Sequence, residues 1–364
     1  MRIKSYLLLS LILTCNICKS QQNNISVIAY YTGGDNIDSF AVDKLTHIIF
    51  SFCHLKGNRL NVRNARDTAE IQRLVALKQK YPALKVMLSI GGWGGCGPCS
   101  EVFSSKKARR EFAKSTKELN DYFNTDGLDL DWEYPAIEGF PGHAFVPADK
   151  ENFTALVKVL RKKLGKNNEI SFAAGGFESY IDNSIEWKKV MPKVDRVNLM
   201  SYDLVSGNST VTGHHTPLYS TQQNPESVDK GVKLLEQAGV PANKIVIGAA
   251  FYARMWENVK DTLDGLYLEG RFKAGISRRN FETVLSVDSG FVYHWDSIAQ
   301  APFLYNSQKQ LFVTYDNDKS IALKTQYTID HNLGGIMFWQ LRDDAYEDGL
   351  LKAIDDVKVG YKKK

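Results

Sequence analysis

Three carboxylic acids recur at every second position near the middle of the chain. Asp129, Asp131 and Glu133 stand in the run GLDLDWE, and apolar residues alternate with them: Leu128, Leu130 and Trp132. In an extended strand, a period of two places the acids on one face and the apolar side chains on the other. Neighbouring acids would then be ~7 Å apart by the backbone rise. We expect a strand whose apolar face is covered by helices and whose other face carries a row of carboxylates.

Carboxylates crowded in this way cannot all ionise cheaply when they are buried. At least one should hold a proton near neutral pH, which is the property that a general acid needs. A solvated acidic strand is the plain alternative, but the apolar alternation opposes it. A calcium loop would need a glycine shortly after the acids, whereas Tyr134 and Pro135 follow them here. Spacing by itself leaves a magnesium site open.

The acids belong to one of eight short apolar runs that are typical of buried strands. The runs are Ser26–Tyr31, His47–Cys53, Lys85–Ile90, Gly127–Asp131, Glu169–Ala174, Val197–Tyr202, Lys244–Phe251 and Gly335–Trp339. Helical periodicity appears between several of them, in Ala69–Tyr81, Lys106–Phe123, Lys150–Leu164 and Pro225–Ala238. Strands that alternate with helices predict a parallel α/β fold, and eight repeats fit a closed (β/α)8 TIM barrel.

One interval, between Phe251 and Gly335, is far longer than a single helix needs. It is rich in glycine, tyrosine, phenylalanine and aspartate, and it contains short alternating runs, Gly290–Trp295 and Gln310–Tyr315. We therefore expect a small β-rich subdomain, over about residues 253–320, inserted between the last two barrel strands.

The first twenty residues have the layout of a secretory signal peptide. Arg2 and Lys4 precede an apolar run, Leu7–Thr14, that is too short to span a bilayer, and polar residues follow it. We expect cleavage near Ser20 and a secreted chain. A buried N-terminal helix and a lipoprotein anchor at Cys15 are the alternatives.

The composition is that of an ordinary globular protein. The chain has 364 residues, of which 43% are hydrophobic and 24% charged, and these values exclude a disordered or collagen-like chain. The formal net charge of +5 is mild and gives no reason to expect a nucleic-acid partner. We expect no stable membrane insertion, and we expect a monomer.

Three cysteines lie beyond the predicted signal peptide: Cys53, Cys96 and Cys99. Cys96 and Cys99 flank Gly-Pro and could close a small disulfide loop in an oxidising compartment. A redox CxxC motif is the alternative, although thioredoxin-like surroundings are missing from the sequence. A structural zinc site would need a second pair of ligands, which we do not find. The sequence leads us to expect no metal and no cofactor.

The acidic run resembles the DxxDxDxE signature of glycoside hydrolase family 18, the chitinases and their relatives. Asp126, Asp129, Asp131 and Glu133 match its four acidic positions. Further segments agree in order along the chain: Ser89-Ile90-Gly91-Gly92 is similar to the family's SxGG, Met200-Ser201-Tyr202-Asp203 to its MxYD, and Trp339 to the tryptophan of its last strand. The resemblance runs from about Val27 to about Asp344.

This resemblance implies one catalytic (β/α)8 barrel over residues 21–364, with the α+β insertion of the deep-cleft branch, and a secreted chitinase that hydrolyses chitin or chito-oligosaccharides. It implies a retaining reaction in which the substrate's own N-acetyl group attacks C1. Glu133 would be the general acid and then the base. Asp131 would stabilise the oxazolinium ion, Asp129 would share a proton with Asp131, and Asp126, whose parity is opposite, would support the start of the strand.

The resemblance assigns the remaining site residues as follows. Tyr202 would align the acetamide carbonyl, Asp203 would contact the sugar, and Trp339 would form an apolar floor under the sugar that is cleaved. Other side chains match substrate-binding positions around the same pocket: Tyr30, Phe52, Met200, Tyr252 and Arg254. Ser89, Gly91 and Gly92 would be structural, since small residues allow a close approach of neighbouring acids and loops.

Three other functions remain in competition with a chitinase. An endo-β-N-acetylglucosaminidase acting on N-linked glycans would use identical chemistry. A chitinase-like lectin would bind chitin without cleaving it, but such proteins typically lack the acid that is present here as Glu133. A metabolic barrel enzyme would want a glycine-rich phosphate site after the last two strands, and Phe251–Arg254 does not resemble one.

Overall fold

The computed structural model describes residues 25–362, with side chains to residue 360, and it contains a closed eight-stranded parallel barrel. The signal peptide predicted for residues 1–20 lies outside this range. The barrel strands are β1 (Ser26–Tyr31), β2 (His47–Lys56), β4 (Lys85–Gly91), β5 (Gly127–Asp131), β6 (Glu169–Gly175), β7 (Arg196–Met200), β8 (Ile245–Ala250) and β14 (Gly335–Trp339). β1 pairs with both β2 and β14, which closes the barrel. The predicted (β/α)8 fold is therefore confirmed.

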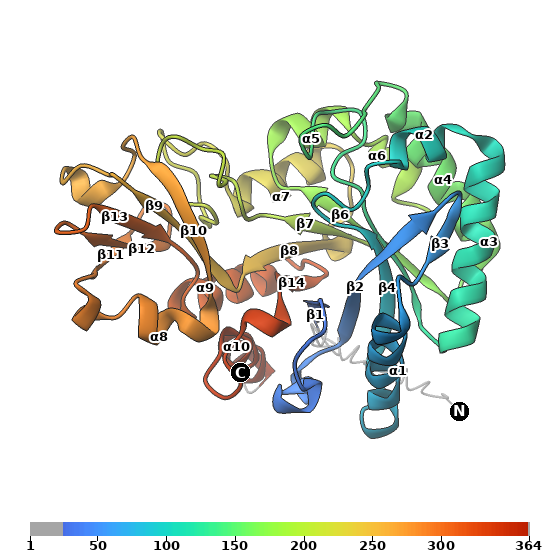
Figure 1. Cartoon of the computed structure of the whole chain (residues 1–364), viewed down its shortest axis with the longest axis horizontal. Helices are drawn as coiled ribbons and strands as arrows, with labels where there is room; N and C mark the ends of the chain where they lie inside the picture. Colours follow the sequence, from blue (N-terminus) through green and yellow to red (C-terminus); the bar gives the residue numbers. More distant parts are fainter. Residues whose placement is uncertain (1–24, 363–364) are drawn as a thin grey trace, which may run out of the picture.

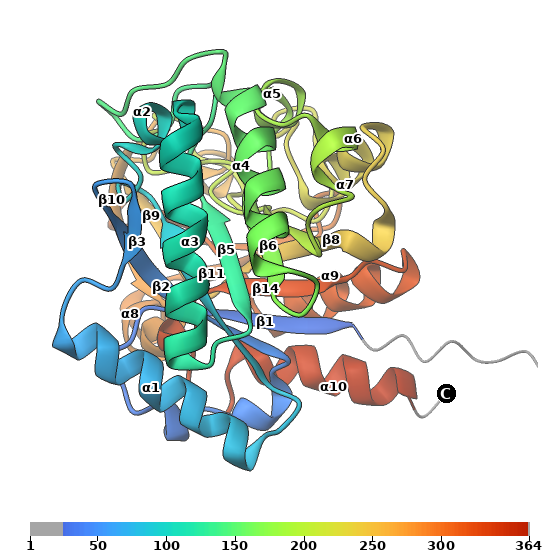
Figure 2. The same ribbon diagram turned by 90° about the vertical axis from the view of Figure 1, so that its right-hand side faces the viewer.

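Helices surround the barrel on its outer face (Figures 1 and 2). The longer ones are α1 (Ala65–Lys80), α3 (Lys106–Phe123), α4 (Asp149–Leu164), α7 (Val228–Gln237), α9 (Asp318–Asp330) and α10 (Leu350–Lys362). Shorter elements complete the rim: α2 (Cys99–Ser104), α5 (Glu178–Asn183), α6 (Trp187–Val190) and β3 (Arg59–Asn61), which forms a hairpin with β2. None of the described helices has the length and apolar character needed to cross a bilayer.

A five-stranded antiparallel sheet lies between β8 and β14 in the chain and stands to one side of the barrel (Figure 1). Its strands are β9 (Tyr252–Glu257), β10 (Arg271–Ser277), β11 (Val292–Asp296), β12 (Ala301–Asn306) and β13 (Leu311–Thr314), with α8 (Phe281–Val284) between β10 and β11. The predicted insertion between the last two barrel strands is confirmed. The runs Gly290–Trp295 and Gln310–Tyr315 correspond to β11 and β13.

The side chains of β5 alternate between the helix-covered face and the interior of the barrel. Leu128, Leu130 and Trp132 are buried in the large apolar layer between the strands and the helices, whereas Asp129 and Asp131 project into the barrel. Other strands fill the barrel interior with large apolar side chains, among them Ile28, Tyr30, Ile49, Met87, Met200, Val246 and Met337. Side chains therefore fill the interior of the barrel, and a ligand would bind at the ends of the strands.

Charged side chains form ion pairs across the amino-terminal end of the barrel. Glu169 begins β6 and pairs with Lys85, Arg196 and His47, each the first residue of its own strand. Although burial acts to raise the pKa of Glu169, hydrogen bonding with His47 and the charge of Arg196 hold it well below its usual range. This network occupies the end opposite to the carboxyl ends of the strands.

Candidate active site

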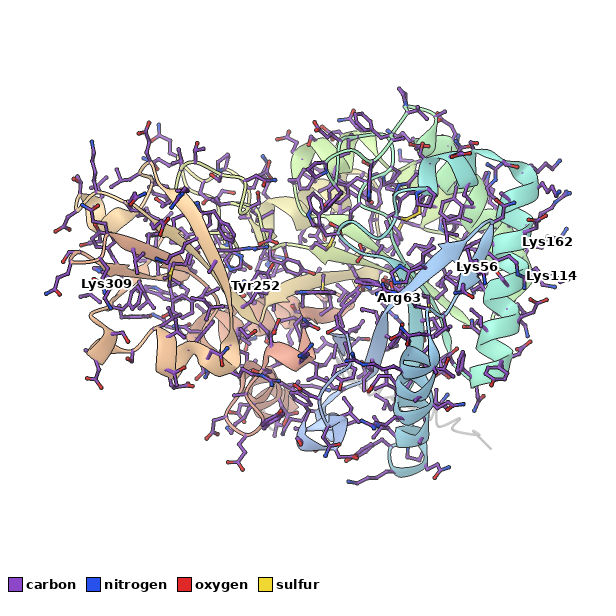
Figure 3. The ribbon with its side chains drawn as sticks, viewed as in Figure 1. Lys56, Arg63, Lys114, Lys162, Tyr252 and Lys309 are labelled. Carbon is purple, nitrogen blue, oxygen red and sulfur yellow. A yellow bond between two sulfur atoms is a disulfide. The ribbon has the colours of Figure 1, made fainter. Side chains whose placement is uncertain are left out.

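A cavity of about 700 Å³ lies at the carboxyl ends of the barrel strands and is bounded on one side by the inserted sheet. Of the residues predicted for catalysis and substrate binding, those that line it are Tyr30, Phe52, Asp131, Glu133, Met200, Tyr202, Asp203, Tyr252, Arg254 and Trp339. Asp129 is fully buried beneath it. Figure 3 places Tyr252 at the junction between the barrel and the inserted sheet. Residues far apart in the sequence are therefore brought to one site.

Four donors surround the carboxylate of Asp129. Its Oδ2 accepts hydrogen bonds from the hydroxyls of Tyr30 and Ser89, each at 3.0 Å. Its Oδ1 accepts from the Ser171 hydroxyl at 2.6 Å and from the Asn198 amide at 3.1 Å. Burial raises the pKa of Asp129, and the hydrogen bonds oppose that rise. Donors on both oxygens favour the ionised form of this acid.

Asp131 lies in contrasting surroundings, one step along the same strand. Its Oδ1 is buried and accepts no hydrogen bond from the described protein groups. Burial, followed by the charges of Glu133 and Asp129, raises the pKa of Asp131 well above its ordinary value. Of the two aspartates, Asp131 is therefore the one on which a proton is favoured.

Glu133 stands two residues beyond Asp131, the last residue of β5, and faces the cavity. Burial raises the pKa of Glu133 to about 7, with a hydrogen bond from Tyr134 acting against the rise and the charge of Asp203 adding to it. A carboxyl group with such a pKa can both donate and accept a proton near neutrality. The geometry thus supplies one group suited to acid–base chemistry at the edge of a buried acidic row.

Two glycines at the end of β4 allow it to approach β5, the strand that carries the acids. Gly91 has φ of +105°, and a Cβ there would be 1.9 Å from the carbonyl oxygen of Asp131. Gly92 has φ of +78°, its N–H donates to the same carbonyl at 3.0 Å, and a Cβ there would be 2.3 Å from the Phe52 ring. A side chain at Gly91 would therefore press on the strand end where Asp131 stands, and one at Gly92 would press on the Phe52 ring.

Asp126 directly precedes β5, at the end opposite to Glu133, and its carboxylate contacts α1 and β4. Its Oδ2 accepts from the Val86 backbone N–H at 2.7 Å, and both carboxylate oxygens accept from Lys78 Nζ at 2.8 Å.

Asp203 is held by a bidentate pair with Arg254 from the inserted sheet. Arg254 Nε donates to Oδ1 at 2.7 Å and Nη2 donates to Oδ2 at 2.5 Å. Burial acts to raise the pKa of Asp203, but the close contact with His215, the hydrogen bonds from Arg254 and the charge of Arg254 hold it below the usual range. Asp203 is therefore a fixed negative charge, and it couples the barrel to the insertion.

Aromatic rings form the floor and one wall of the cavity. Trp339 stacks on Phe52 with ring centroids 5.7 Å apart and an interplanar angle of 15°, and it also contacts Tyr30 at 5.9 Å. Tyr202 contacts Tyr252 at 6.2 Å, edge to face. An apolar surface beside fixed carboxylates suits a pyranose ring, which has C–H faces and a polar rim.

Several residues of the site were missed by sequence reasoning. Ser171 and Asn198 hold Asp129, His215 lies 3.5 Å from Asp203, and Tyr134 and Phe177 line the cavity. Ser171 and Asn198 had a detectable signal, because each is a polar residue inside a fully buried apolar strand. His215 comes from a loop, and no periodic pattern marks it.

Three further tryptophans lie in different surroundings. Trp93 lines the cavity, whereas Trp132 packs in the core against Phe103 and Phe153. Trp295 lies in the inserted sheet beneath Lys319, whose Nζ is 3.7 Å from the ring centroid.

Cys96 and Cys99 are joined by a disulfide, and Cys53 is a buried free thiol. Among residues 25–362, no group of three histidine, cysteine, aspartate or glutamate side chains has the arrangement of a metal site.

Comparison with known proteins agrees with this geometry. The family model for glycosyl hydrolases family 18 matches residues 26–344. Chitinase A1 of Niallia circulans is 34% identical over 314 residues, which cover 80% of this chain and 45% of that protein, so the chain spans just under half of its length. Chitinase B of Serratia marcescens is 29% identical over 392 residues, covering 88% of this chain and 77% of that one.

A solved structure gives the same result. A glycoside hydrolase family 18 N-acetylglucosaminidase from Paenibacillus barengoltzii superposes with a TM-score of 0.82 at 34% identity, covering 92% of this chain and all of that one. The family match spans most of the sequence and includes every strand of the barrel that carries the acidic row. The chain belongs to glycoside hydrolase family 18.

Proposed function

We propose that this protein is a secreted chitinase that hydrolyses the β-1,4 linkages between N-acetylglucosamine units of chitin and chito-oligosaccharides. The observation that carries the proposal is the pairing of Glu133 and Asp131 in one cavity, both with raised pKa values, above an Asp129 held by four donors. Export rests on the predicted signal peptide at residues 1–20. Action as a monomer is part of the proposal.

The nucleophile in this reaction is the substrate's own acetamide. The cavity contains two further carboxylates, and both are engaged: Asp203 pairs with Arg254, and Asp343 accepts a hydrogen bond from the Ser277 hydroxyl at 2.6 Å. Asp131 favours its protonated form, in which a carboxyl group is a poor nucleophile. An acetamide carbonyl that closes on C1 requires no attacking carboxylate and retains the configuration at C1.

Glu133 then acts twice. It gives its proton to the glycosidic oxygen as the C1–O bond breaks and the acetamide oxygen bonds to C1, forming an oxazolinium ion. It next takes a proton from the water that opens this ion, which restores the acid. Asp131 and Asp129 share one proton: as the positive charge forms, this proton moves to Asp129, and the Asp131 carboxylate accepts the acetamide N–H and balances the charge.

The aromatic residues position the sugar for this attack. Trp339 packs under the pyranose ring of the unit that is cleaved, and Tyr202 donates to the acetamide carbonyl to align it with C1. Such positioning of reacting atoms contributes several kcal/mol to catalysis in general. Tyr30, Phe52, Met200, Tyr252 and Arg254 complete the walls that hold the substrate.

A second candidate is supported by the resemblance to the Paenibacillus N-acetylglucosaminidase. Release of single N-acetylglucosamine units, or cleavage in the core of N-linked glycans, would use the same acids and acetamide chemistry. The groove beyond the cavity would then decide which chains are accepted.

The substitution Glu133→Gln tests the assigned role. We expect it to lower kcat on chitopentaose by at least a thousandfold, because the amide cannot donate the proton, while the affinity for the same oligosaccharide changes by less than about threefold. Glu138→Gln is the matched control, since this exposed glutamate stands five residues later and outside the cavity. Equal loss of turnover and binding in the Glu133 variant would contradict the role.

Substrate class is tested by digesting chito-oligosaccharides of defined length beside fluorescent N-glycans and identifying the products. Shorter chito-oligomers as the main products support the chitinase. Cleavage confined to N-glycans, or binding without cleavage, would replace it with the endo-β-N-acetylglucosaminidase or the lectin.

A further inference from the structure

The loop that follows β4 carries both Trp93 and the disulfide, and it forms one edge of the cavity. Trp93 is 52% exposed although it is a large aromatic side chain, and it lines the cavity together with Glu133 and Tyr134. Its ring contacts Tyr134 at 6.4 Å and meets Phe140 edge-on at 5.5 Å. An exposed aromatic ring beside a sugar-sized cavity is a surface on which a further sugar can pack.

The disulfide loop, residues 94–99, packs directly against the loop that follows β5. A Cβ on Gly94 would be 3.1 Å from the ring of Phe140, and one on Gly97 would be 3.2 Å from Nε2 of His143. Phe140 and His143 contact each other with ring centroids 4.8 Å apart. Two loops from neighbouring strands thus form one wall, and the ring of Trp93 rests on it.

The far side of the wall is tied down by a buried aspartate. Asp149 is fully buried at the start of α4, and its carboxylate accepts from the Ser100 hydroxyl at 2.9 Å. It also accepts from the Val146 backbone N–H at 2.9 Å. Ser100 directly follows Cys99 in α2, which packs against α3 and α4 at the rim (Figure 2). The disulfide loop is therefore anchored at Cys99, while its other end leads to Trp93.

We propose that the Cys96–Cys99 disulfide is a positioning element for substrate binding, which holds the ring of Trp93 at the edge of the cavity so that a sugar of the bound chain can pack on it. The inference rests on the proposed function. Trp339, at the end of β14, and Trp93, in the loop after β4, line the same cavity as Glu133, so a chain that rests on both rings lies beside the acid. Fixing the loop before binding lowers the entropy lost when the sugar packs on Trp93.

The disulfide itself is buried. Cys96 is 3% exposed and Cys99 is not exposed at all, so a dissolved reductant reaches the sulfurs only when the loop opens. The test therefore uses the Cys96→Ser/Cys99→Ser variant of the full chain rather than reduction alone.

Two measurements separate positioning from a general structural role. The first is KM for chitopentaose, which is long enough to reach Trp93. The second is the inhibition constant of the thiazoline analogue of N-acetylglucosamine, a single sugar that fills the part of the cavity over Trp339. We expect the double-serine variant to raise KM about tenfold, with kcat and the thiazoline inhibition constant within twofold of the unsubstituted protein.

A double-mutant cycle with Trp93→Ala tests the link between the disulfide and the ring. If the disulfide acts through Trp93, removing the disulfide in the Trp93→Ala background should cause a further rise in KM of less than twofold. Trp295→Ala is the matched control, because this tryptophan lies outside the cavity. Its KM should be unchanged.

Three results would overturn the inference: KM unchanged in the double-serine variant, KM and the thiazoline constant raised equally, or effects of the two substitutions that simply add. Failure of the proposed function is a different result, since the unsubstituted protein would then cleave no chito-oligosaccharide. In that case chitopentaose binding to the Glu133→Gln protein, with and without the two cysteines, still decides the role of the disulfide: equal affinities contradict it.

Discussion

Two aspartates on one strand, two positions apart in the sequence, differ in their affinity for a proton because their neighbours differ. Asp129 has donors on both oxygens from Tyr30, Ser89, Ser171 and Asn198, whereas Oδ1 of Asp131 has none among the described groups. Hydrogen bonds to a carboxylate favour its charge, and burial without them opposes it. The alternation of acidic and apolar residues in the sequence places the acids on one face. The hydrogen-bond donors around each acid then decide which of them carries the proton.

The pH dependence of activity follows from Glu133 at this scale. Its pKa is raised to about 7, so the proton that the reaction needs is present below that pH and is lost above it. We expect kcat to fall above a pH of about 7 and to fall again at low pH, where Asp131 and Asp129 take up a second proton. A pH–rate profile measures both limbs, and a rate that stays constant between pH 6 and pH 9 would contradict the assignment.

The same shift has a consequence for stability. A carboxyl group whose pKa is higher in the folded than in the unfolded protein binds its proton more tightly when folded, so folding stability falls as the pH rises from about 4.5 to about 7. Glu133→Gln replaces the titrating carboxyl group by an amide, so this fall in stability with rising pH is removed. Its unfolding temperature should therefore exceed that of the unsubstituted protein by more at pH 8 than at pH 4.

At the scale of elements, the apolar runs identified the barrel strands well but misplaced several of their ends. β1, β5 and β14 begin and end where the sequence predicts, whereas the run ending at Tyr202 extends two residues beyond β7. The aromatic side chain of Tyr202 had extended the apolar pattern into the loop. Ends of this kind depend on pairing with neighbouring strands, which local periodicity does not contain.

The substitution Gly91→Ala tests the junction of β4 and β5. The new Cβ would be 1.9 Å from the carbonyl oxygen of Asp131, in a backbone conformation with φ of +105° that alanine rarely adopts. We expect a loss of at least about 2 kcal/mol in unfolding free energy, as is typical when a special backbone conformation and a close contact are broken together.

Urea unfolding of the Gly91→Ala variant measures this effect. Gly57→Ala is the control, because a Cβ at Gly57 meets no atom within 4 Å while φ is also positive, at +57°. Equal losses in the two variants would assign the effect to backbone conformation alone and not to the contact with Asp131.

At the scale of the whole molecule, a buried ion pair joins the insertion to the barrel. Asp316 follows β13, accepts from the Ala250 backbone N–H at the end of β8, and pairs with Lys324 of α9 at 2.7 Å; neither side chain is exposed. Lys324 also donates to the Thr216 hydroxyl at 2.6 Å. When an ion pair is buried away from solvent, separating its two charges costs free energy, so the pair keeps its geometry.

We therefore expect Lys324→Met to destabilise the protein by about 3–5 kcal/mol, since it leaves the carboxylate of Asp316 buried without its partner. The Lys324→Met/Asp316→Asn double variant should recover part of this loss. Lys319→Met is the control on the same helix, because Lys319 is exposed, and its effect should stay within about 0.5 kcal/mol. Chemical unfolding of the three variants provides the comparison, and a Lys324 variant as stable as the Lys319 variant would contradict the role of the pair.

The amino-acid sequence by itself determined the strand–helix alternation, the place of the insertion and the acidic row on one face of a strand, because each is a local pattern with a period of two or of 3.6 residues. Only the tertiary structure decided which groups surround those acids. Ser171, Asn198 and His215 lie 38 to 82 residues beyond Glu133 in the chain, and their effect on proton affinity depends on distances that barrel closure sets. The wall that carries Trp93 likewise exists only because β4 and β5 end side by side, which brings together two loops that share no sequence pattern.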